Sequence, residues 1–199
     1  MFTPQEWGLP TETWMAYATK LQAEAEREIG NHPEALRWLA ARGIPEEAVR
    51  TYRLGYLAGK TGKAGRYRSR SVLGLAPKER DGKTVTKLFI PRGITIPLFG
   101  EDGRLINLRI RKPNADIARE EGRKALKYME LEGSCRRPFL LRPQTEEARL
   151  AVYVIVEGEL DAILCHHATE GRMGALAVRS TRASPMPWPI RCLKRRSGC

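Results

Sequence analysis

Val152-Tyr-Val-Ile-Val-Glu-Gly-Glu-Leu-Asp161 is the stretch that decides the fold class of this chain. Residues 151–156 form a short apolar run rich in β-branched side chains, which is typical of a strand buried on both faces of a parallel sheet. Gly158 then permits a tight turn, and residues 161–168 have the pattern of a helix. This order of strand, turn and helix places Glu157 at the carboxyl end of a parallel strand, where ligands bind in open α/β sheets.

Three carboxylates, those of Glu157, Glu159 and Asp161, fall within five residues of one another. Such crowding of like charges is costly unless a cation lies nearby. Mg²⁺ prefers oxygen ligands and usually takes only one or two carboxylates from a protein. The simpler interpretation is a set of acids at a helix N-terminus, which the helix dipole favours. The local pattern leaves both interpretations open.

The composition is that of a globular protein with a strong basic excess. The chain has 199 residues, 42% of them hydrophobic, and 35 lysines and arginines against 23 acids give a formal net charge of +12. This length allows one large or two small domains with a real core. The charge favours polyanionic partners, with nucleic acid first among them. A ribosomal or other structural RNA-binding protein has the same balance, so charge alone names no function.

No apolar run approaches the length of a transmembrane helix, and the N-terminus lacks the charged-then-apolar plan of a signal peptide. We therefore expect a cytoplasmic protein without a membrane partner. The four cysteines are scattered and form no Cys-x-x-Cys pair, so we expect them to be reduced, and no zinc site is evident. They are Cys135, Cys165, Cys192 and Cys199.

The N-terminal region is expected to be helical. Residues 11–29 have apolar side chains at helical spacing, Pro33 is placed to open a second helix, and residues 45–52 form a third. Trp14 and Trp38 are interpreted as core side chains rather than as platforms for stacking bases.

Residues 55–71 are rich in glycine and basic side chains, and we expect a loop there. The triplet Gly59-Lys60-Thr61 suggests a P-loop, but position 54, where the upstream glycine should lie, is a leucine, and no apolar strand precedes it. Walker-type nucleotide binding is therefore rejected. A plain solvated loop is favoured over a loop that touches phosphate.

Residues 83–111 predict antiparallel strands at 84–90, 93–99 and 105–111, with a hairpin turn at 100–103. The last strand alternates cleanly. Ile106, Leu108 and Ile110 are expected on the core side, and Asn107, Arg109 and Arg111 on the other. Further basic residues in neighbouring segments are Arg92, Arg104, Lys112, Arg123, Lys124 and Lys127. A basic face beside the carboxylates suits a phosphodiester backbone and its metal, whereas the alternative is a merely solvated basic face.

Several short motifs follow one another along the chain: Ala40-Ala-Arg-Gly-Ile44, Leu54-Gly-Tyr56, Ile94-Thr-Ile-Pro97, Asp102-Gly-Arg104, Arg109-Ile-Arg111, Ala125-Leu-Lys-Tyr128, Val154-Ile-Val-Glu-Gly-Glu-Leu-Asp161 and Gly174-Ala-Leu-Ala-Val-Arg-Ser-Thr181. This ordered set resembles the polymerase core of bacterial DnaG-type DNA primases. The residues within the motifs are most similar to those of primases from phages and mobile elements. The last two motifs resemble the first two strands of the TOPRIM fold. The resemblance covers about residues 33–184.

The resemblance implies an α+β fold with a helical N-terminal segment, an antiparallel β subdomain and a partial α/β TOPRIM domain. The expected divisions are a helical region at 1–54, a basic β-rich primase-core subdomain at 55–148, a partial TOPRIM domain at 149–184 and an aberrant basic tail at 185–199. The implied function is the synthesis of short RNA primers on a template for DNA replication.

The resemblance also implies roles for individual residues. Glu157 matches the catalytic TOPRIM glutamate, Asp161 matches the acid four residues later, and the two would hold Mg²⁺ or Mn²⁺. Arg109, Arg111, Lys127 and Arg92 would bind the template or the incoming nucleotide. The implied partners are single-stranded DNA, nucleoside triphosphates and a replicative helicase.

Two departures from the family pattern affect these expectations. Residues 1–30 contain no cysteine for the family's zinc-binding domain, and no aspartate follows Asp161 to supply a second acidic motif, Asp-x-Asp. Three prolines alternate at 185–189, where a helix should begin. Our hypothesis is that the reading frame was lost near Pro185, which leaves a primase truncated within the TOPRIM domain and poor in activity. The alternatives are a non-catalytic single-stranded nucleic-acid-binding remnant and another TOPRIM enzyme, such as a nuclease or topoisomerase.

Overall fold

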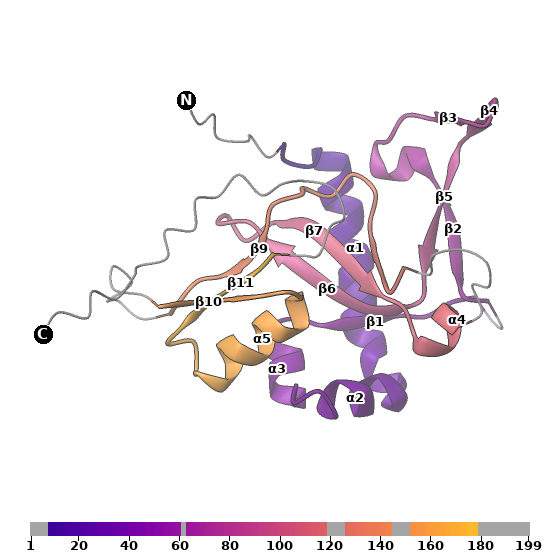
Figure 1. Cartoon of the computed structure of the whole chain (residues 1–199). Coiled ribbons are helices and arrows are strands. Elements are labelled where there is room, and N and C mark those ends of the chain that lie inside the picture. Colours follow the sequence, from indigo (N-terminus) through magenta and orange to yellow (C-terminus); the bar gives the residue numbers. More distant parts are fainter. Residues whose placement is uncertain (1–7, 61–62, 119–125, 145–151, 179–199) are drawn as a thin grey trace, which may run out of the picture.

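The computed structural model describes residues 8–60, 63–118, 126–144 and 152–178. These residues form helices, antiparallel sheets and one parallel strand pair, so the expected α+β class is confirmed (Figure 1). The expected tail at 185–199, the end of the second TOPRIM motif at 179–181, and Arg123, Lys124 and Ala125 lie outside the described residues. No helix in the described part of the chain is both long and apolar enough to cross a lipid bilayer.

A four-stranded antiparallel sheet forms the centre of the molecule. Its strand order is β1 (Gly55–Leu57), β6 (Gly93–Phe99), β7 (Leu105–Arg111) and β8 (Tyr128–Glu130). The strands predicted at 93–99 and 105–111 are confirmed. Directly opposed residues of an antiparallel pair share a face. The pairing of Ile94 with Arg111 and of Ile96 with Arg109 therefore places the two arginines on the face of β6 that carries its buried isoleucines.

Helix α1 (Glu12–Glu28) covers the opposite face of this sheet. Thr11 caps the helix by accepting a hydrogen bond from the backbone N–H of Trp14, at 3.2 Å. The buried side of α1 packs in one hydrophobic cluster with Leu108 and Ile110 of β7. Gly55 permits the close approach of β1, because a Cβ there would lie 2.6 Å from the carbonyl carbon of Ala25.

The arginine-bearing face is covered by η1 (Ile29–Asn31), α2 (Pro33–Ala40) and α3 (Glu46–Thr51), whose apolar side chains share a second cluster with β6. Ile106 belongs to this second cluster, so its predicted placement beside Leu108 is wrong. The reason is a register shift: Leu98 opposes Asn107 but Phe99 opposes Leu105, which leaves Ile106 in a bulge.

Two ribbons project from the central sheet. Strand β2 (Gly65–Ser69) pairs with β5 (Lys87–Pro91), and β3 (Lys78–Arg80) pairs with β4 (Lys83–Val85). The 3₁₀ helix η2 (Arg70–Leu73) follows β2, and α4 (Asn114–Ala118) follows β7. The expectation of a loop over residues 55–71 is thus wrong for β1 and β2. Pairing with β5 overrides the glycine-rich sequence, and Gly65 assists it, because a Cβ there would lie 2.4 Å from the carbonyl oxygen of Ile90.

The C-terminal part of the described chain is a three-stranded sheet in the order β10 (Tyr153–Val156), β11 (Gly174–Ala177) and β9 (Phe139–Leu141), with α5 (Glu159–Ala168) packed on it. Strands β10 and β11 are parallel, which confirms the predicted strand, turn and helix. The prediction that this strand is buried on both faces is wrong. Tyr153 and Ile155 are 44% and 50% exposed, whereas Val154 and Val156 on the other face pack against the core that α5 shares.

The two sheets share one core. Leu160, Ile163 and Ala175 pack in the same cluster as Ile44 and Leu54 from the N-terminal half. A polar link adds to this contact: the hydroxyl of Tyr52 donates to Nδ1 of His166 at 2.6 Å, and Nε2 of His166 donates to the carbonyl of Arg142 at 2.9 Å. Because this core is continuous, the end of β10 has a fixed position relative to β7.

Candidate active site

Glu157 lies where the sequence places it, at the carboxyl end of β10 and before the first turn of α5. The neighbouring strand ends beside it, because the backbone N–H of Val178 donates to the carbonyl of Val156 at 3.0 Å. Gly158 is the N-cap residue of α5 in an extended conformation. The Glu157 side chain is exposed to solvent and accessible to a ligand.

Glu159 is different, because its side chain is only 1% exposed. Its carboxylate forms an ion pair with Arg109, which reaches it from β7 of the other sheet and is 17% exposed. The guanidinium of Arg109 also lies 4.7 Å from the centre of the Tyr128 ring. A buried carboxylate needs a partner of this kind. Glu159 therefore joins the two sheets and is not an open ligand.

Asp161 lies in the first turn of α5 and folds back over Gly158, where a Cβ would meet its Oδ2 at 3.1 Å. Its Oδ1 lies 3.4 Å from Nη2 of Arg42, which follows helix α2. The two side chains are 48% and 43% exposed. A half-exposed pair of this kind is weak and open to exchange with another cation.

Arg42, Arg109 and Arg111 form a group that we call the arginine cluster. The guanidiniums of Arg111 and Arg42 lie 4.1 Å and 5.0 Å from the centre of the Trp38 ring. Arg111 also donates to the side-chain oxygen of Asn114 at 2.6 Å and to the carbonyl of Lys112. Burial lowers the pKa of Arg111, and the nearby charge of Arg42 acts in the same direction. The cluster thus concentrates positive charge beside Glu159 and Asp161, with Arg109 and Arg111 largely buried and Arg42 half-exposed.

Tyr128 lies at the centre of this group. Burial is the main cause that raises the pKa of its hydroxyl, and the charge of Glu159 raises it further, while the three arginines act in the opposite direction. The aromatic ring and its hydroxyl therefore sit between the acidic and the basic side of the site. Sequence reasoning assigned no role to Tyr128 or Arg42, although both lie in motifs that carried the resemblance. Trp38, interpreted as a core side chain, is half-buried beneath two guanidiniums.

The two remaining predicted basic residues lie outside the arginine cluster. Arg92 forms two hydrogen bonds of 2.7 Å with the carboxylate of Asp116 in α4, and these raise the pKa of the guanidinium. The side chain of Asp116 is 4% exposed. Lys127 is exposed, and its backbone carbonyl accepts a hydrogen bond from Lys112 at 3.0 Å. The structure thus joins Arg109 to the carboxylate segment and Arg92 to α4.

Within the described ranges, no three His, Cys, Asp or Glu side chains are placed to hold a metal ion together. Glu157 and Asp161 supply two carboxylates from one strand–helix turn. This is the number that Mg²⁺ usually takes from a protein, the remaining ligands being water and substrate phosphates. The donor type fits Mg²⁺ or Mn²⁺, and the donor number implies weak binding without a phosphate ligand.

Comparison with solved structures gives consistent neighbours. The RNA polymerase domain of Mycobacterium tuberculosis primase DnaG is 16% identical, with a TM-score of 0.60, and the match covers 86% of this chain and 58% of that one. The Aquifex aeolicus primase, with zinc-binding and RNA polymerase domains, is 16% identical with a TM-score of 0.55 over 87% of this chain and 43% of that one. A DnaG primase catalytic domain bound to single-stranded DNA is 15% identical, with a TM-score of 0.53 over 85% and 56%.

These likenesses concern the fold, because the identities are low. The chain spans about half the length of the solved proteins that it matches. No family model matches the sequence. No curated protein matches it either.

Proposed function

We propose that this chain, which has the fold of DnaG-type primase catalytic domains, is a primase-like protein that binds a single-stranded template and nucleoside triphosphates. In the proposed reaction the 3′-hydroxyl of a primer attacks the α-phosphate of a nucleoside triphosphate, a new phosphodiester bond forms and pyrophosphate leaves. The observation that carries the proposal is the contact of half-exposed Asp161 with Arg42 of the arginine cluster, one turn after the exposed Glu157.

The carboxylates are the proposed metal ligands. Glu157 is exposed at the end of β10, and Asp161 is half-exposed in the next turn. Both carboxylates are therefore accessible to a cation that also binds a substrate phosphate. A bound Mg²⁺ or Mn²⁺ would supply Lewis-acid stabilisation of the attacking and leaving oxygens. Arg42 contacts Asp161, and a bound metal would replace Arg42 at that carboxylate.

The basic residues are proposed to bind phosphate and template. Arg42 contacts Asp161, and Arg111 lies with Arg42 over the Trp38 ring, so the two would offset the charge that develops in the transition state. Arg109 would act by holding Glu159, and through it the first turn of α5, in position. Lys127 is exposed and can contact a phosphate without rearrangement, whereas Arg92 would have to leave Asp116.

The neighbours support the choice of ligand in part, because one of them was solved with single-stranded DNA and another with a duplex carrying a 6-nucleotide overhang. A cytoplasmic location, a helicase partner, the division at residues 54, 148 and 184, and an incomplete metal site stay predictions.

The test is metal-dependent incorporation of ribonucleotides by the full chain on a single-stranded template, together with Mn²⁺ binding followed by electron paramagnetic resonance. We expect weak Mn²⁺ binding that a nucleoside triphosphate strengthens, and incorporation that is low because the protein supplies few ligands. Glu157→Gln should remove the nucleotide-dependent Mn²⁺ binding and any incorporation. Arg50→Ala, on the exposed side of α3, is the matched control. Unchanged Mn²⁺ binding in Glu157→Gln would contradict the assignment.

The second candidate is a non-catalytic single-stranded nucleic-acid-binding protein. It is favoured by the lack of a three-ligand group among the described residues. Binding that weakens with salt and ignores metal, with no incorporation under any condition, would establish it. Cleavage of DNA in place of synthesis would instead indicate another TOPRIM enzyme.

A further inference from the structure

A second basic surface is formed by residues 65–91, which we call the ribbon segment. It comprises β2, η2, β3, β4 and β5, and it contains seven lysines and arginines against two acids, a net charge of +5. Figure 1 places these strands at the opposite side of the molecule from β10 and α5, which carry the candidate carboxylates. None of the residues assigned above to catalysis or phosphate binding, apart from the adjoining Arg92, is near this segment in sequence.

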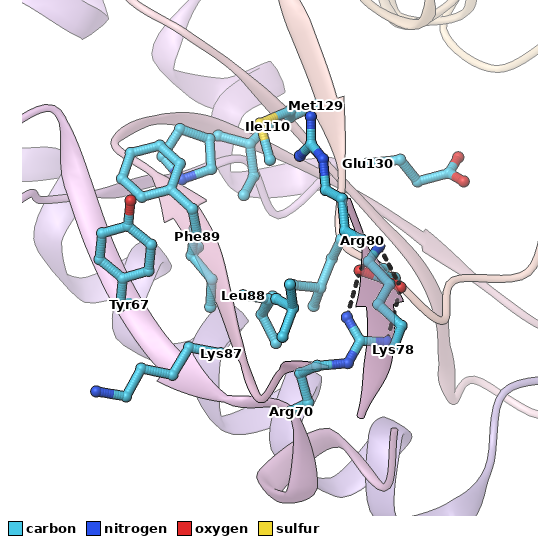
Figure 2. A pocket seen from close by; sticks show the side chains of 15 residues that line it. Tyr67, Arg70, Lys78, Arg80, Lys87, Leu88, Phe89, Ile110, Met129 and Glu130 are labelled. Carbon is cyan, nitrogen blue, oxygen red and sulfur yellow. Dashed lines mark hydrogen bonds and ion pairs between the residues drawn. The ribbon is translucent and has the colours of Figure 1, made fainter. Parts of the chain in front are cut away.

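A cavity of about 340 Å³ lies between the ribbon segment and strands β7 and β8 (Figure 2). Its volume is at the lower end of the range for pockets that bind small organic groups. Apolar side chains line much of it, and Leu88 lies between the two sides in the close-up view. The apolar lining residues are Val85, Leu88, Phe89, Ile90, Pro91, Ile110, Met129 and Leu131.

One wall of the cavity is aromatic. Tyr67 is 65% exposed, although tyrosine is a large side chain that gains from burial. Its ring lies 5.2 Å from that of Phe89, centre to centre, at an angle of 55°. The two come from paired strands and are directly opposed in the ladder, so the backbone holds them in place. An exposed aromatic side chain of this kind offers a flat surface on which a base can stack.

The charges at the cavity rim divide into two kinds. Arg70 and Lys78 each form an ion pair with Glu132, with N–O distances of 2.8 Å and 3.2 Å. Lys87 is exposed, and no ion pair within the described residues involves it, while Arg80 is 72% exposed and 3.7 Å from its neighbour Asp81. Figure 2 shows Lys87 on the aromatic side and Arg80 on the other, with Glu130 pointing away from the cavity. The cations available to a ligand therefore flank the apolar floor.

We propose that the ribbon segment is a second binding site, for single-stranded nucleic acid, in which bases stack on Tyr67 and Phe89 and phosphates contact Lys87 and Arg80. An acidic peptide would satisfy the cations but would leave the aromatic wall without a matching group. Alternating flat bases and phosphates match both features of the surface. The choice of DNA as the strand rests on the proposed function, whereas binding at this surface does not require catalysis.

The test is binding of a fluorescein-labelled 20-nucleotide oligothymidylate to the full chain in EDTA, measured by anisotropy at several salt concentrations. Tyr67→Ala should weaken binding about tenfold, the size typical of losing one stacked base. Lys87→Ala should lower the slope of log affinity against log salt by about 0.7, the value for one phosphate contact on a single strand. The matched controls are Tyr153→Ala and Arg172→Ala, exposed residues of the three-stranded-sheet region, which should bind as the unchanged protein does.

A second measurement locates the strand directly. Oligonucleotides carrying 5-iodouracil should crosslink on irradiation to Tyr67 or Phe89, identified by mass spectrometry. Unchanged affinity in both Tyr67→Ala and Lys87→Ala, or crosslinks confined to other segments, would overturn the proposal. Displacement of the oligonucleotide by polyglutamate at equal charge concentration would identify an acidic-peptide site and also overturn it. Because no metal is present, loss of primer synthesis, as in Glu157→Gln, leaves the expected binding unchanged, so the two proposals fail separately.

Discussion

Arg109 in β7 and Lys87 in β5 both stand in strands of mostly apolar sequence, yet their surroundings differ. Arg109 is 17% exposed, paired with the buried Glu159 and stacked on Tyr128. Lys87 is exposed at the rim of a cavity. Arg111 of the arginine cluster is likewise 8% exposed, whereas Arg80 of the ribbon segment is 72% exposed.

The difference teaches what a net charge of +12 can and cannot indicate. A cation removed from water is held by a specific partner, and its loss affects stability. A cation in water contributes little to stability but attracts a polyanion, and salt screens that attraction. Basic residues that count equally toward the net charge thus contribute either to stability or to polyanion binding. Single substitutions can distinguish the two contributions.

The largest expected effect is that of Arg109→Met. It leaves the carboxylate of Glu159, which is 1% exposed, without this cation, so the free energy of unfolding should fall by about 3 kcal/mol. Urea denaturation followed by circular dichroism measures it. Lys87→Met is the matched control and should change the free energy of unfolding by less than about 0.5 kcal/mol. If the two variants are equally stable, Arg109 and Lys87 do not differ as described. Adding Glu159→Gln to Arg109→Met should restore part of the loss.

A smaller effect is expected for Glu132→Gln at the edge of the ribbon segment. Arg70, whose side chain is 6% exposed, donates two hydrogen bonds to Glu132, whose side chain is 39% exposed. Because solvent screens the exposed partner, we expect a loss of about 1 kcal/mol in the free energy of unfolding. Thermal denaturation at pH 7 measures it, and Glu79→Gln in the exposed strand β3 is the control. No loss would show that this pair is as dispensable as an exposed one.

The same pair predicts a pH dependence. The hydrogen bonds from Arg70 are the main cause that lowers the pKa of Glu132 from its ordinary value of 4.5. A carboxylate with a lowered pKa stabilises the folded state above the ordinary value, and this contribution is lost as pH falls through the lowered value. Between pH 5 and pH 3, therefore, the unchanged protein should lose more stability than Glu132→Gln. Parallel curves for the two proteins would contradict this.

The smallest effect is expected for Arg42→Ala. Removing a half-exposed cation from Asp161 should raise Mn²⁺ affinity at the carboxylates by less than about fivefold, because exposed ion pairs contribute less than about 1 kcal/mol. Titration of free Mn²⁺ by electron paramagnetic resonance measures it, with Arg37→Ala on the exposed side of α2 as control. A lower affinity in Arg42→Ala would mean that Arg42 supports metal binding rather than competing with it.

Local sequence patterns predicted the elements well where one period dominates. The alternation at 105–111 and the apolar run before Glu157 located β7 and β10. The alternation predicted the wrong face for Ile106. The bulge there depends on how β6 pairs with β7, and the sequence of β7 alone does not indicate it. Residues 65–69, at the end of the glycine-rich stretch 55–71, form a strand because the residues at 87–91 pair with them.

The candidate site was predictable in its acids and less so in its cations. Glu157 and Asp161 lie in one short motif, so their proximity follows from chain geometry. Arg42 is 119 positions from Asp161, and Arg109 is 50 positions from Glu159. Neither ion pair can be predicted from the spacing of residues in the sequence. Both depend on how the two sheets pack around a shared core. The crowding of carboxylates did indicate that cations must lie nearby, and the structure identifies them.

The position of β9 has a consequence for synthesis of the protein on the ribosome. Strand β9 precedes β10 in the chain but pairs with β11, and Leu141 lies opposite Ala175. Translation proceeds at roughly 5–20 residues per second, so β9 waits roughly 2–7 seconds for the residues of β11 to be made. During that interval Phe139, which ends 2% exposed, has no place in the sheet. The nascent chain thus exposes an apolar segment until β11 has been made, and this is the stage at which a chaperone would bind.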